Sequence, residues 1–471
     1  MISLLLIKDL RLLLRDFKFQ LFFVLLVILF IIAAVSSSVT YQTYSKEFQE
    51  ALNEHLDNVH SETGYRLIRI ISRLHKISVL DVPSPALLFS SYENYHNKLT
   101  NDSMLYNPFF SRYGSAGDEV FNLNWNFILG ILSGFIMLMM SFEAISREKL
   151  SGTLRLLSIN GFKRQSILWC KYLSYMILYL IIIIPPALIS MLLFFTLTGT
   201  WDVTYMLSFL LILLISIPFA SFFVFLGIFI SMSKNYRSSI VLVISIWLLF
   251  VIIIPQSANI FGKQISPIKT NTEYSQHQRT VFNNEFTERR RIMDEIQERG
   301  ELENWGDLHA IPVNYADEKR NQVELQRLDD NKKQLQTVEK IASISPFIQY
   351  EKISEIIFNK GLYLQRFQEE TMRNTIFQVR NLIIEQDSRD EKSSHMFYSQ
   401  AAYMQFFSED GEVSFSNQKF EHPNLLFVTD VYTDDALLKT QKIMIWLIPV
   451  LVSNLLLMTG SVMKLERLDI L

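Results

Sequence analysis

Residues 204–232 read TYMLSFLLILLISIPFASFFVFLGIFISM, and this stretch decides the fold class. It contains no Lys, Arg, Asp or Glu. It is also longer than the roughly 20 residues that a helix needs to cross the hydrocarbon of a bilayer. A backbone in lipid must satisfy its own hydrogen bonds, and a helix does so within one segment. The stretch therefore predicts a membrane-spanning helix.

Five further stretches are equally apolar and are about 20 residues long or longer. We predict six spans, at residues 19–39, 123–142, 172–197, 204–232, 238–256 and 442–463, so that residues 172–256 hold spans three to five. Hydrophobic residues make up 49% of the 471-residue chain and are concentrated in these runs, which is typical of a membrane protein. The predicted fold class is an all-α membrane protein of six transmembrane helices, with a large and mostly helical extracytoplasmic domain built from two insertions.

Lys and Arg gather in the short segments on one side of the predicted bundle: before span one, between spans two and three, between spans four and five, and in the tail 464–471. Short basic loops stay in the cytoplasm. We therefore expect both termini in the cytoplasm and the chain in the cytoplasmic (inner) membrane. The apolar core from Leu21 to Val35 also suits a cleaved signal peptide, but its length and its long preceding segment favour an uncleaved span.

The segments 40–122 and 257–441 then lie outside and are too long for simple loops. Segment 257–441 holds 30 acidic and 22 basic residues, and residues 282–299 and 315–344 predict helices. A hairpin is predicted around Asp410–Gly411. Segment 40–122 predicts a helix from Tyr44 to about Leu80. We expect the two segments to pack together as one domain, which could hold an extracytoplasmic protein partner. Its net acidity argues against nucleic acid.

Several chemistries are missing from the sequence. No glycine-rich loop ends in Gly-Lys-Ser/Thr, so an ATP site of the P-loop type is not expected in this chain. The eight histidines are scattered and there is a single cysteine, Cys170, so we predict no metal site and no cofactor. No ionisable residue lies well inside a span, which argues against an ion-coupled transporter. Gly130 and Gly134 form a Gly-x-x-x-Gly pair that could serve as a dimer contact, and Asn454 should face protein.

The N-terminal segment 1–18 predicts a short amphipathic helix. Its basic residues recur at helical spacing on one face, and leucines cover much of the rest. Such a helix is typical of one that lies in the headgroup plane, although a simple charged flank is the alternative. The residues assigned to this interfacial helix are Lys8, Arg11, Arg15 and Lys18.

The loop 143–171 carries the most informative polar pattern. Residues 148–157 read EKLSGTLRLL, and basic residues follow at Lys163, Arg164 and Lys171. Ser151-Gly152-Thr153 should break the helix that leaves span two and cap a new one. The next residues predict a short amphipathic helix beneath the membrane. A structured basic loop on the inner side can receive a soluble partner.

This pattern, Glu148-x-x-Ser151-Gly152-Thr153-Leu154-x-x-Leu157, resembles the signature of type-2 ATP-binding-cassette (ABC) exporter permeases. The interfacial helix, the six spans and the placement of the loop are similar as well. The family often has a proline after the Thr-Leu run, where this chain has Ile159-Asn160-Gly161, and its outer loops are usually small. The resemblance implies an ATPase-coupling role for Glu148, Ser151, Gly152, Thr153, Leu154, Arg155, Leu157, Lys163 and Arg164.

The resemblance implies a permease subunit that couples ATP hydrolysis by a separate ABC ATPase to export across the membrane. ATP and Mg²⁺ would be bound by that partner chain, and a second permease copy or a paralogue would complete the transporter. Uncharged spans favour an apolar or amphipathic cargo. In this interpretation Leu154 and Leu157 fill a groove of the ATPase. The alternative is a membrane-anchored assembly or signalling protein whose outer domain holds a partner without transport.

Overall fold

The computed structural model describes residues 2–61, 78–79, 84–89, 110–112, 119–121, 123–233, 236–300, 332–359 and 436–467, with isolated positions between 326 and 428. Its elements in chain order are α1 (Ile2–Leu14), α2 (Phe17–Ser61), β1 (Ser78–Val79), η1 (Pro85–Leu88), β2 (Phe110–Arg112), β3 (Glu119–Phe121), η3 (Phe127–Leu132), α4 (Ser133–Ser141), α5 (Ser146–Leu150), α6 (Thr153–Ile159), α7 (Arg164–Thr198), α8 (Val203–Ser231), α9 (Tyr236–Leu248), η4 (Leu249–Ile253), α10 (Ile254–Ile265), α11 (Asn271–Arg299), α13 (Pro346–Ile357), β4 (Phe427–Val428) and α16 (Ala436–Glu466).

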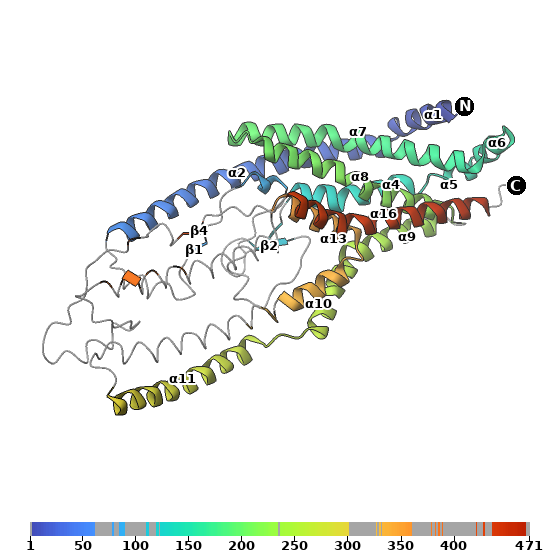
Figure 1. The fold of residues 1–471 in the computed structure, drawn as a ribbon. Coiled ribbons are helices and arrows are strands. Elements are labelled where there is room, and N and C mark those ends of the chain that lie inside the picture. The colour runs from blue at the N-terminus through green and yellow to red at the C-terminus, as the bar shows by residue number, and fades with distance from the viewer. Residues whose placement is uncertain are drawn as a thin grey trace.

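The predicted six spans are confirmed, and the fold is that of an all-α membrane protein. Within the described residues, six helices are long and apolar enough to cross a membrane: α2, the run from η3 to α5, α7, α8, the run from α9 to α10, and α16. Both chain ends lie at one end of this bundle, here called the terminal end, together with α5 and α6 (Figure 1). α11 and the far half of α2 project from the other end, here called the insert end (Figure 1).

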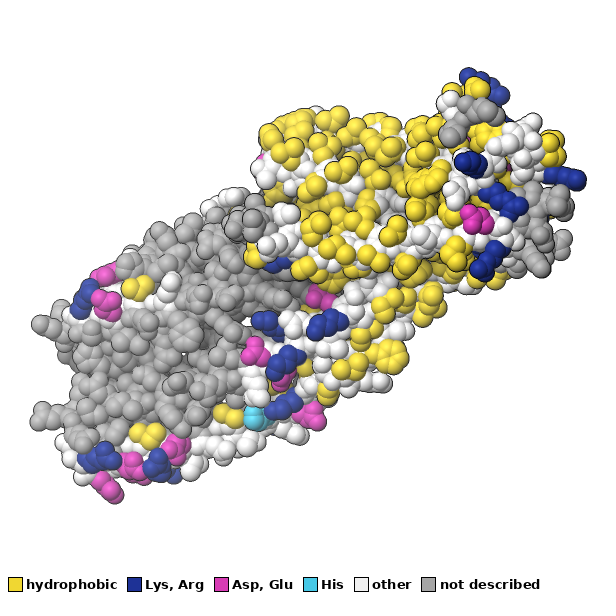
Figure 2. All heavy atoms as spheres, turned by 45° about the vertical axis from the view of Figure 1, so that its right-hand side comes forward, with side chains coloured by type: hydrophobic (Ala, Val, Ile, Leu, Met, Phe, Trp, Pro, Cys, Tyr) yellow, Lys and Arg dark blue, Asp and Glu magenta, His cyan; other side chains and the backbone are white. Residues whose placement is uncertain are grey.

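The bundle is built around α8 and the η3–α4 run, which are its most buried spans. α7 packs against α2 and α8, and α16 closes the other side of α8. Apolar side chains on α2, α9 and α16 remain exposed, as expected for helices that face lipid. Figure 2 shows these side chains as a band over the bundle, with Lys and Arg gathered beyond it at the terminal end.

Several polar groups inside the bundle are hydrogen-bonded to other parts of the protein. The Tyr179 hydroxyl donates to Ser216 Oγ at 2.7 Å, and the Trp125 indole donates to Ser190 Oγ at 3.0 Å. The Asn454 amide donates to the carbonyl of Pro218 at 2.8 Å, so the prediction that Asn454 faces protein is confirmed. An amide that hydrogen-bonds a neighbouring helix holds the two helices together in a medium without water.

The Gly-x-x-x-Gly pair packs inside the chain instead of forming the dimer contact considered above. A Cβ on Gly134 would lie 2.6 Å from the Phe223 ring of α8. A Cβ on Gly130 would lie 2.9 Å from the Phe347 ring of α13. Because these two glycines have no side chains, α8 and α13 can both pack closely against the second span.

Helix α13 is the main departure from the predicted outer domain. It comes from the second insert, residues 257–441, yet it packs against α8, α16, η3 and η4 inside the bundle. Pro346 occupies its first turn, where a missing N–H is harmless. The segment 332–342 leads into it and packs on α10, where a Cβ on Gly262 would clash with Val338. This insert is therefore partly a component of the membrane bundle.

Other parts of the inserts are described in pieces. The predicted helix 282–299 lies within α11, which begins with a capping box formed by Thr270 and Glu273. Of the predicted helix 315–344, residues 332–342 are helical, and residues 315–325 lie outside the described residues. Residues 62–77 of the predicted helix 44–80 and the predicted hairpin at Asp410–Gly411 also lie outside them. β1 pairs in parallel with β4, which joins the first insert, residues 40–122, to the second. β2 and β3 form an antiparallel pair.

Candidate functional site

The loop between the second and third spans folds as two short helices joined by a glycine turn. α5 ends at Leu150 and α6 begins at Thr153, with Gly152 between them at a φ of +72°. Glycine adopts this left-handed conformation without the steric cost of a Cβ and is the usual residue just past a helix end. A second left-handed glycine, Gly161, follows α6 and turns the chain into α7.

The hydroxyls of the Ser-Gly-Thr turn act differently from the predicted cap. Ser151 Oγ and Thr153 Oγ1 both donate to the Glu148 carbonyl at 3.2 Å, and the two oxygens lie 2.9 Å apart. No side-chain hydrogen bond caps the first turn of α6. The hydroxyls therefore fasten the last turn of α5 to the first turn of α6, and this fixes the angle between them.

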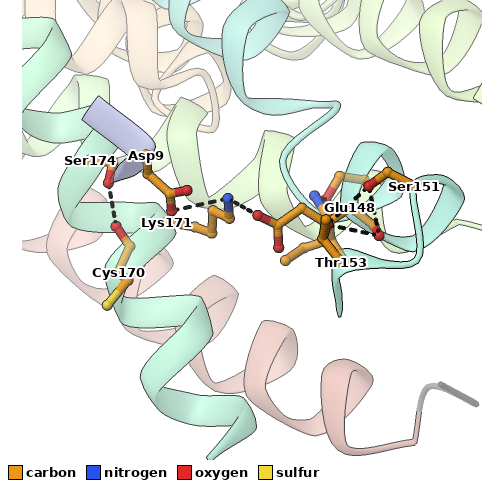
Figure 3. Close-up of polar contacts among 9 residues, drawn as sticks. Asp9, Glu148, Ser151, Thr153, Cys170, Lys171 and Ser174 are labelled. Atoms are coloured by element: carbon orange, nitrogen blue, oxygen red, sulfur yellow. Dashed lines mark hydrogen bonds and ion pairs between the residues drawn. The ribbon is translucent and has the colours of Figure 1, made fainter. Parts of the chain in front are cut away.

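A buried lysine joins this loop to two other elements, as Figure 3 shows. Lys171 Nζ, near the start of α7, lies 2.5 Å from Glu148 Oε1 of α5 and 3.0 Å from Asp9 Oδ2 of α1. The side chains of Lys171, Glu148 and Asp9 are only 10%, 12% and 3% exposed. Buried ions with close partners hold a fixed geometry, because separating them leaves a charge without compensation.

Two further ion pairs tie the turn between α1 and α2 to the same loop. Lys18 Nζ lies 2.5 Å from Glu143 Oε1, and Arg147 Nη1 lies 3.2 Å from Asp16 Oδ2. Asp16 Oδ1 also accepts from the backbone N–H of Lys18 at 3.0 Å, as an N-cap residue does at the start of a helix. This cap explains why the segment 1–18 is not one helix: α1 ends at Leu14, and Lys18 belongs to α2.

The predicted coupling residues divide into a buried and an exposed group. Leu154 is 1% exposed and belongs to the hydrophobic core of the bundle, so it is not available to a groove of another protein, and Leu157 is half-buried against that core. Arg155 and Lys163 are exposed, whereas Arg164 donates to the Leu465 and Glu466 carbonyls at the end of α16. The exposed apolar side chains of α5 and α6 are Leu150 (78%), Ile159 (71%) and Leu156 (59%).

The interfacial residues Lys8, Arg11 and Arg15 are exposed, and the buried face of α1 carries Leu5 and Asp9. Sequence reasoning missed Asp9, Asp16 and Glu143 as members of the site. A signal was present, because Asp9 is a lone acid among leucines and basic residues in the N-terminal helix. In the part of the chain that the structure describes, no group of His, Cys, Asp and Glu could hold a metal ion.

Six apolar helices, with a braced helical loop beside both chain ends, define a multi-pass membrane protein. The chain belongs to the ABC-2 family of transporter proteins, whose family model matches residues 4–360. It is therefore the membrane subunit of an ABC transporter, and the family implies an ABC ATPase partner. Comparison with curated proteins and with solved structures gave no match.

Proposed function

We propose that the loop formed by α5 and α6 receives the ATPase, and that this subunit couples ATP hydrolysis to export of an apolar or amphipathic molecule. The observation that supports this most is that one short loop carries both exposed apolar side chains and a buried ion pair to a span. Leu150, Leu156 and Ile159 offer an apolar contact surface. In the same loop, Glu148 is ion-paired with Lys171 of the third span, and Lys171 is in turn paired with Asp9 of α1.

Each exposed leucine or isoleucine that a groove buries would contribute roughly 1.5–3 kcal/mol to binding. Arg155 and Lys163 would lie at the rim and add mainly orientation and association rate. A shift imposed on α5 and α6 would reach α1 and α7 together, because separating Lys171 from either carboxylate is costly in a buried setting. The loop therefore moves its neighbours and does not flex alone.

In this proposal the terminal end faces the cytoplasm and the inserts lie outside the cytoplasmic (inner) membrane. The basic residues at the terminal end support that orientation, because short cytoplasmic segments are enriched in Lys and Arg. The uncharged spans support an apolar or amphipathic cargo over a metal ion. A second permease copy or a paralogue completes the transporter, and the inserts are free to hold an extracytoplasmic protein.

The test is co-purification of this chain with its ATPase after extraction in mild detergent. Leu156→Asp together with Ile159→Asp should abolish the contact without changing the amount of this chain in the membrane. Asn160→Asp is the matched control, since it adds an exposed charge on the same loop and removes no apolar surface. Leu154→Asp should instead lower the amount of folded chain, because it places a charge in the core.

Retention of the ATPase by the double variant would refute the assigned contact surface. If the unaltered chain brings down no ATPase at all but does bring down a protein through its inserts, then the scaffold function replaces the transporter function.

A further inference from the structure

The exposed face of α1 carries cations that have no carboxylate partner in the described part of the chain. Lys8 and Arg11 of α1 and Arg15 just after it recur at spacings of three and four residues, so they share one face. Among the described residues none of the three forms an ion pair, whereas the neighbouring cations Lys18 and Arg147 each pair with a carboxylate. The charge of this face is therefore open to an anion from outside the chain.

Apolar side chains are exposed beside these cations. Leu4 is 71% exposed, Leu12 is 60% exposed and Ile7 is 45% exposed. Water solvates the cations, but its contact with these apolar side chains is unfavourable. At the surface of a bilayer, apolar side chains enter the acyl boundary while the long stems of Lys and Arg carry their charges to the headgroups. The mixed face of α1 thus matches the surface of a bilayer.

The charge of this face selects among lipids. Of the two acids in the segment 1–18, Asp9 is only 3% exposed and pairs with Lys171, and Asp16 pairs with Arg147. Neither acid offsets the cations of the exposed face. Each basic residue near an anionic membrane surface strengthens the attraction by about fivefold, so three strengthen it by about a hundredfold. A bilayer of neutral lipid offers no such attraction, so the face discriminates between headgroups by their net charge.

The opposite face of α1 is tied to the loop formed by α5 and α6. Asp9 Oδ2 lies 3.0 Å from Lys171 Nζ, which lies 2.5 Å from Glu148 Oε1 of α5. Figure 3 shows the two carboxylates reaching Lys171 from α1 and from α5. The buried side chain of Leu5 lies on the same side of α1, which packs along α7. A lipid that holds the outer face of α1 therefore also fixes the position of Asp9 and of the cluster around Lys171.

We propose that Lys8, Arg11 and Arg15 form a binding site for anionic phospholipids, whose phosphates they contact. The bound lipid holds α1, and through Asp9 and Lys171 the α5–α6 loop, in the position in which that loop receives the ATPase. The lipid site depends on α1 alone. Its effect on the ATPase rests on the coupling function proposed above.

The first measurement asks whether α1 selects anionic lipid, and it uses the full chain without an ATPase. Leu4→Cys in a Cys170→Ser background carries a fluorophore, and the chain is placed in nanodiscs of phosphatidylcholine. A small and equal share of brominated phosphatidylglycerol or brominated phosphatidylcholine is added, and bromine quenches the fluorophore on contact. The relative binding constant of the anionic lipid should exceed that of the neutral lipid by at least about tenfold, and high salt should reduce the difference.

Variants assign this selectivity to the three cations. Lys8→Gln combined with Arg11→Gln and Arg15→Gln should bring the ratio of the two binding constants to about one. Arg11→Lys with Arg15→Lys keeps the charge and should keep most of the selectivity. The matched control removes three exposed cations from α11 and should leave the ratio unchanged: Arg279→Gln, Arg290→Gln and Arg299→Gln.

Three results would overturn the lipid site. Equal quenching by the two lipids in the unaltered chain shows that the face does not select anionic headgroups. Selectivity that survives the triple Gln variant belongs to another surface. Loss of selectivity on adding millimolar inorganic phosphate shows that the cations bind a soluble phosphate in place of a lipid.

The second measurement asks whether the lipid acts on the ATPase contact. The affinity of the ATPase for the full chain is measured in nanodiscs of phosphatidylglycerol and of phosphatidylcholine. The anionic bilayer should tighten binding by at least about fivefold, and the triple Gln variant should abolish this difference. The affinity of that variant should equal that of the unaltered chain in phosphatidylcholine.

The outcomes separate the regulation from the functions on which it rests. Equal affinities in the two bilayers, for a chain that selects anionic lipid, overturn the regulation. A triple Gln variant that binds the ATPase more weakly than the unaltered chain in phosphatidylcholine shows that the cations contact the ATPase itself, which also overturns it. If the unaltered chain binds no ATPase in either bilayer, the coupling function is refuted, while the quenching measurement still decides the lipid site.

Discussion

Different forces join the short helices to the spans at the terminal end and at the insert end of the bundle. At the terminal end, short helices are joined by buried charges, with Lys171 between Glu148 and Asp9. At the insert end, η1 and α13 are joined to α8 by rings such as Phe89 and Phe358. A buried ion pair that opens leaves an uncompensated charge, whereas apolar contacts are non-directional and can part and re-form. The cluster of Lys171, Glu148 and Asp9 is here called the joint, and the loss of one partner should cost more stability there than at the aromatic contact.

The largest expected effect comes from removing the charge at the joint. Lys171→Met leaves the carboxylates of Asp9 and Glu148 buried without a cation, and this should cost about 3–5 kcal/mol. We expect a lower midpoint of thermal unfolding in detergent and loss of ATPase-driven transport. Asp9→Asn and Glu148→Gln added to Lys171→Met remove every charge of the cluster and should recover most of the stability. If Lys171→Met unfolds at the same temperature as the unaltered chain, the joint is not held by charge.

A smaller effect is expected from Phe358→Leu, where α13 meets η1 and α8. The substitution keeps the site apolar and nearly filled but removes the ring pairs with Phe89 and Phe209, which should cost about 1–1.5 kcal/mol. Thermal unfolding measures this loss. The difference between the two ends would disappear if Phe358→Leu proved as destabilising as Lys171→Met.

The smallest effect should come from the exposed ion pair between Asp16 and Arg147. Arg147 is 72% exposed, so the pair should contribute only about 0–1 kcal/mol. Asp16→Asn removes the charge but keeps a side chain that caps α2 equally well. We expect an unfolding midpoint close to that of the unaltered chain, and any difference should vanish at high salt. A loss comparable to that of Lys171→Met would show that this outer pair belongs to the joint.

Hydropathy alone predicted the number and approximate limits of the spans, because a bilayer demands long apolar segments whatever they pack against. The Ser151-Gly152-Thr153 motif also predicted the helix break at Gly152, since a left-handed turn favours glycine. It was harder to predict which residues of a helix face the rest of the protein. Leu154 and Leu156 are chemically identical, yet one is buried in the bundle and the other is exposed.

The insertion of α13 could not be predicted from its sequence. Its 12 residues are too few to cross a bilayer, and Lys352 and Glu355 give it the composition of a helix in water. Only the arrangement in space shows that Glu339 lies against Lys352 and hides its charge. In the same way Asp9 gained its role from Lys171, which is far away in the sequence. Pairings over long sequence distances leave little local pattern.

The length of α2 has a mechanical consequence. Its 45 residues form one unbroken helix of about 68 Å, more than twice the roughly 30 Å of hydrocarbon in a bilayer. Its base is held beside the loop 143–171 by the pair between Lys18 and Glu143. A tilt of about 10° at that base would swing the far tip, about 68 Å away, by roughly 12 Å. The helix is thus a lever that amplifies small rotations at one membrane face into displacements well beyond the other.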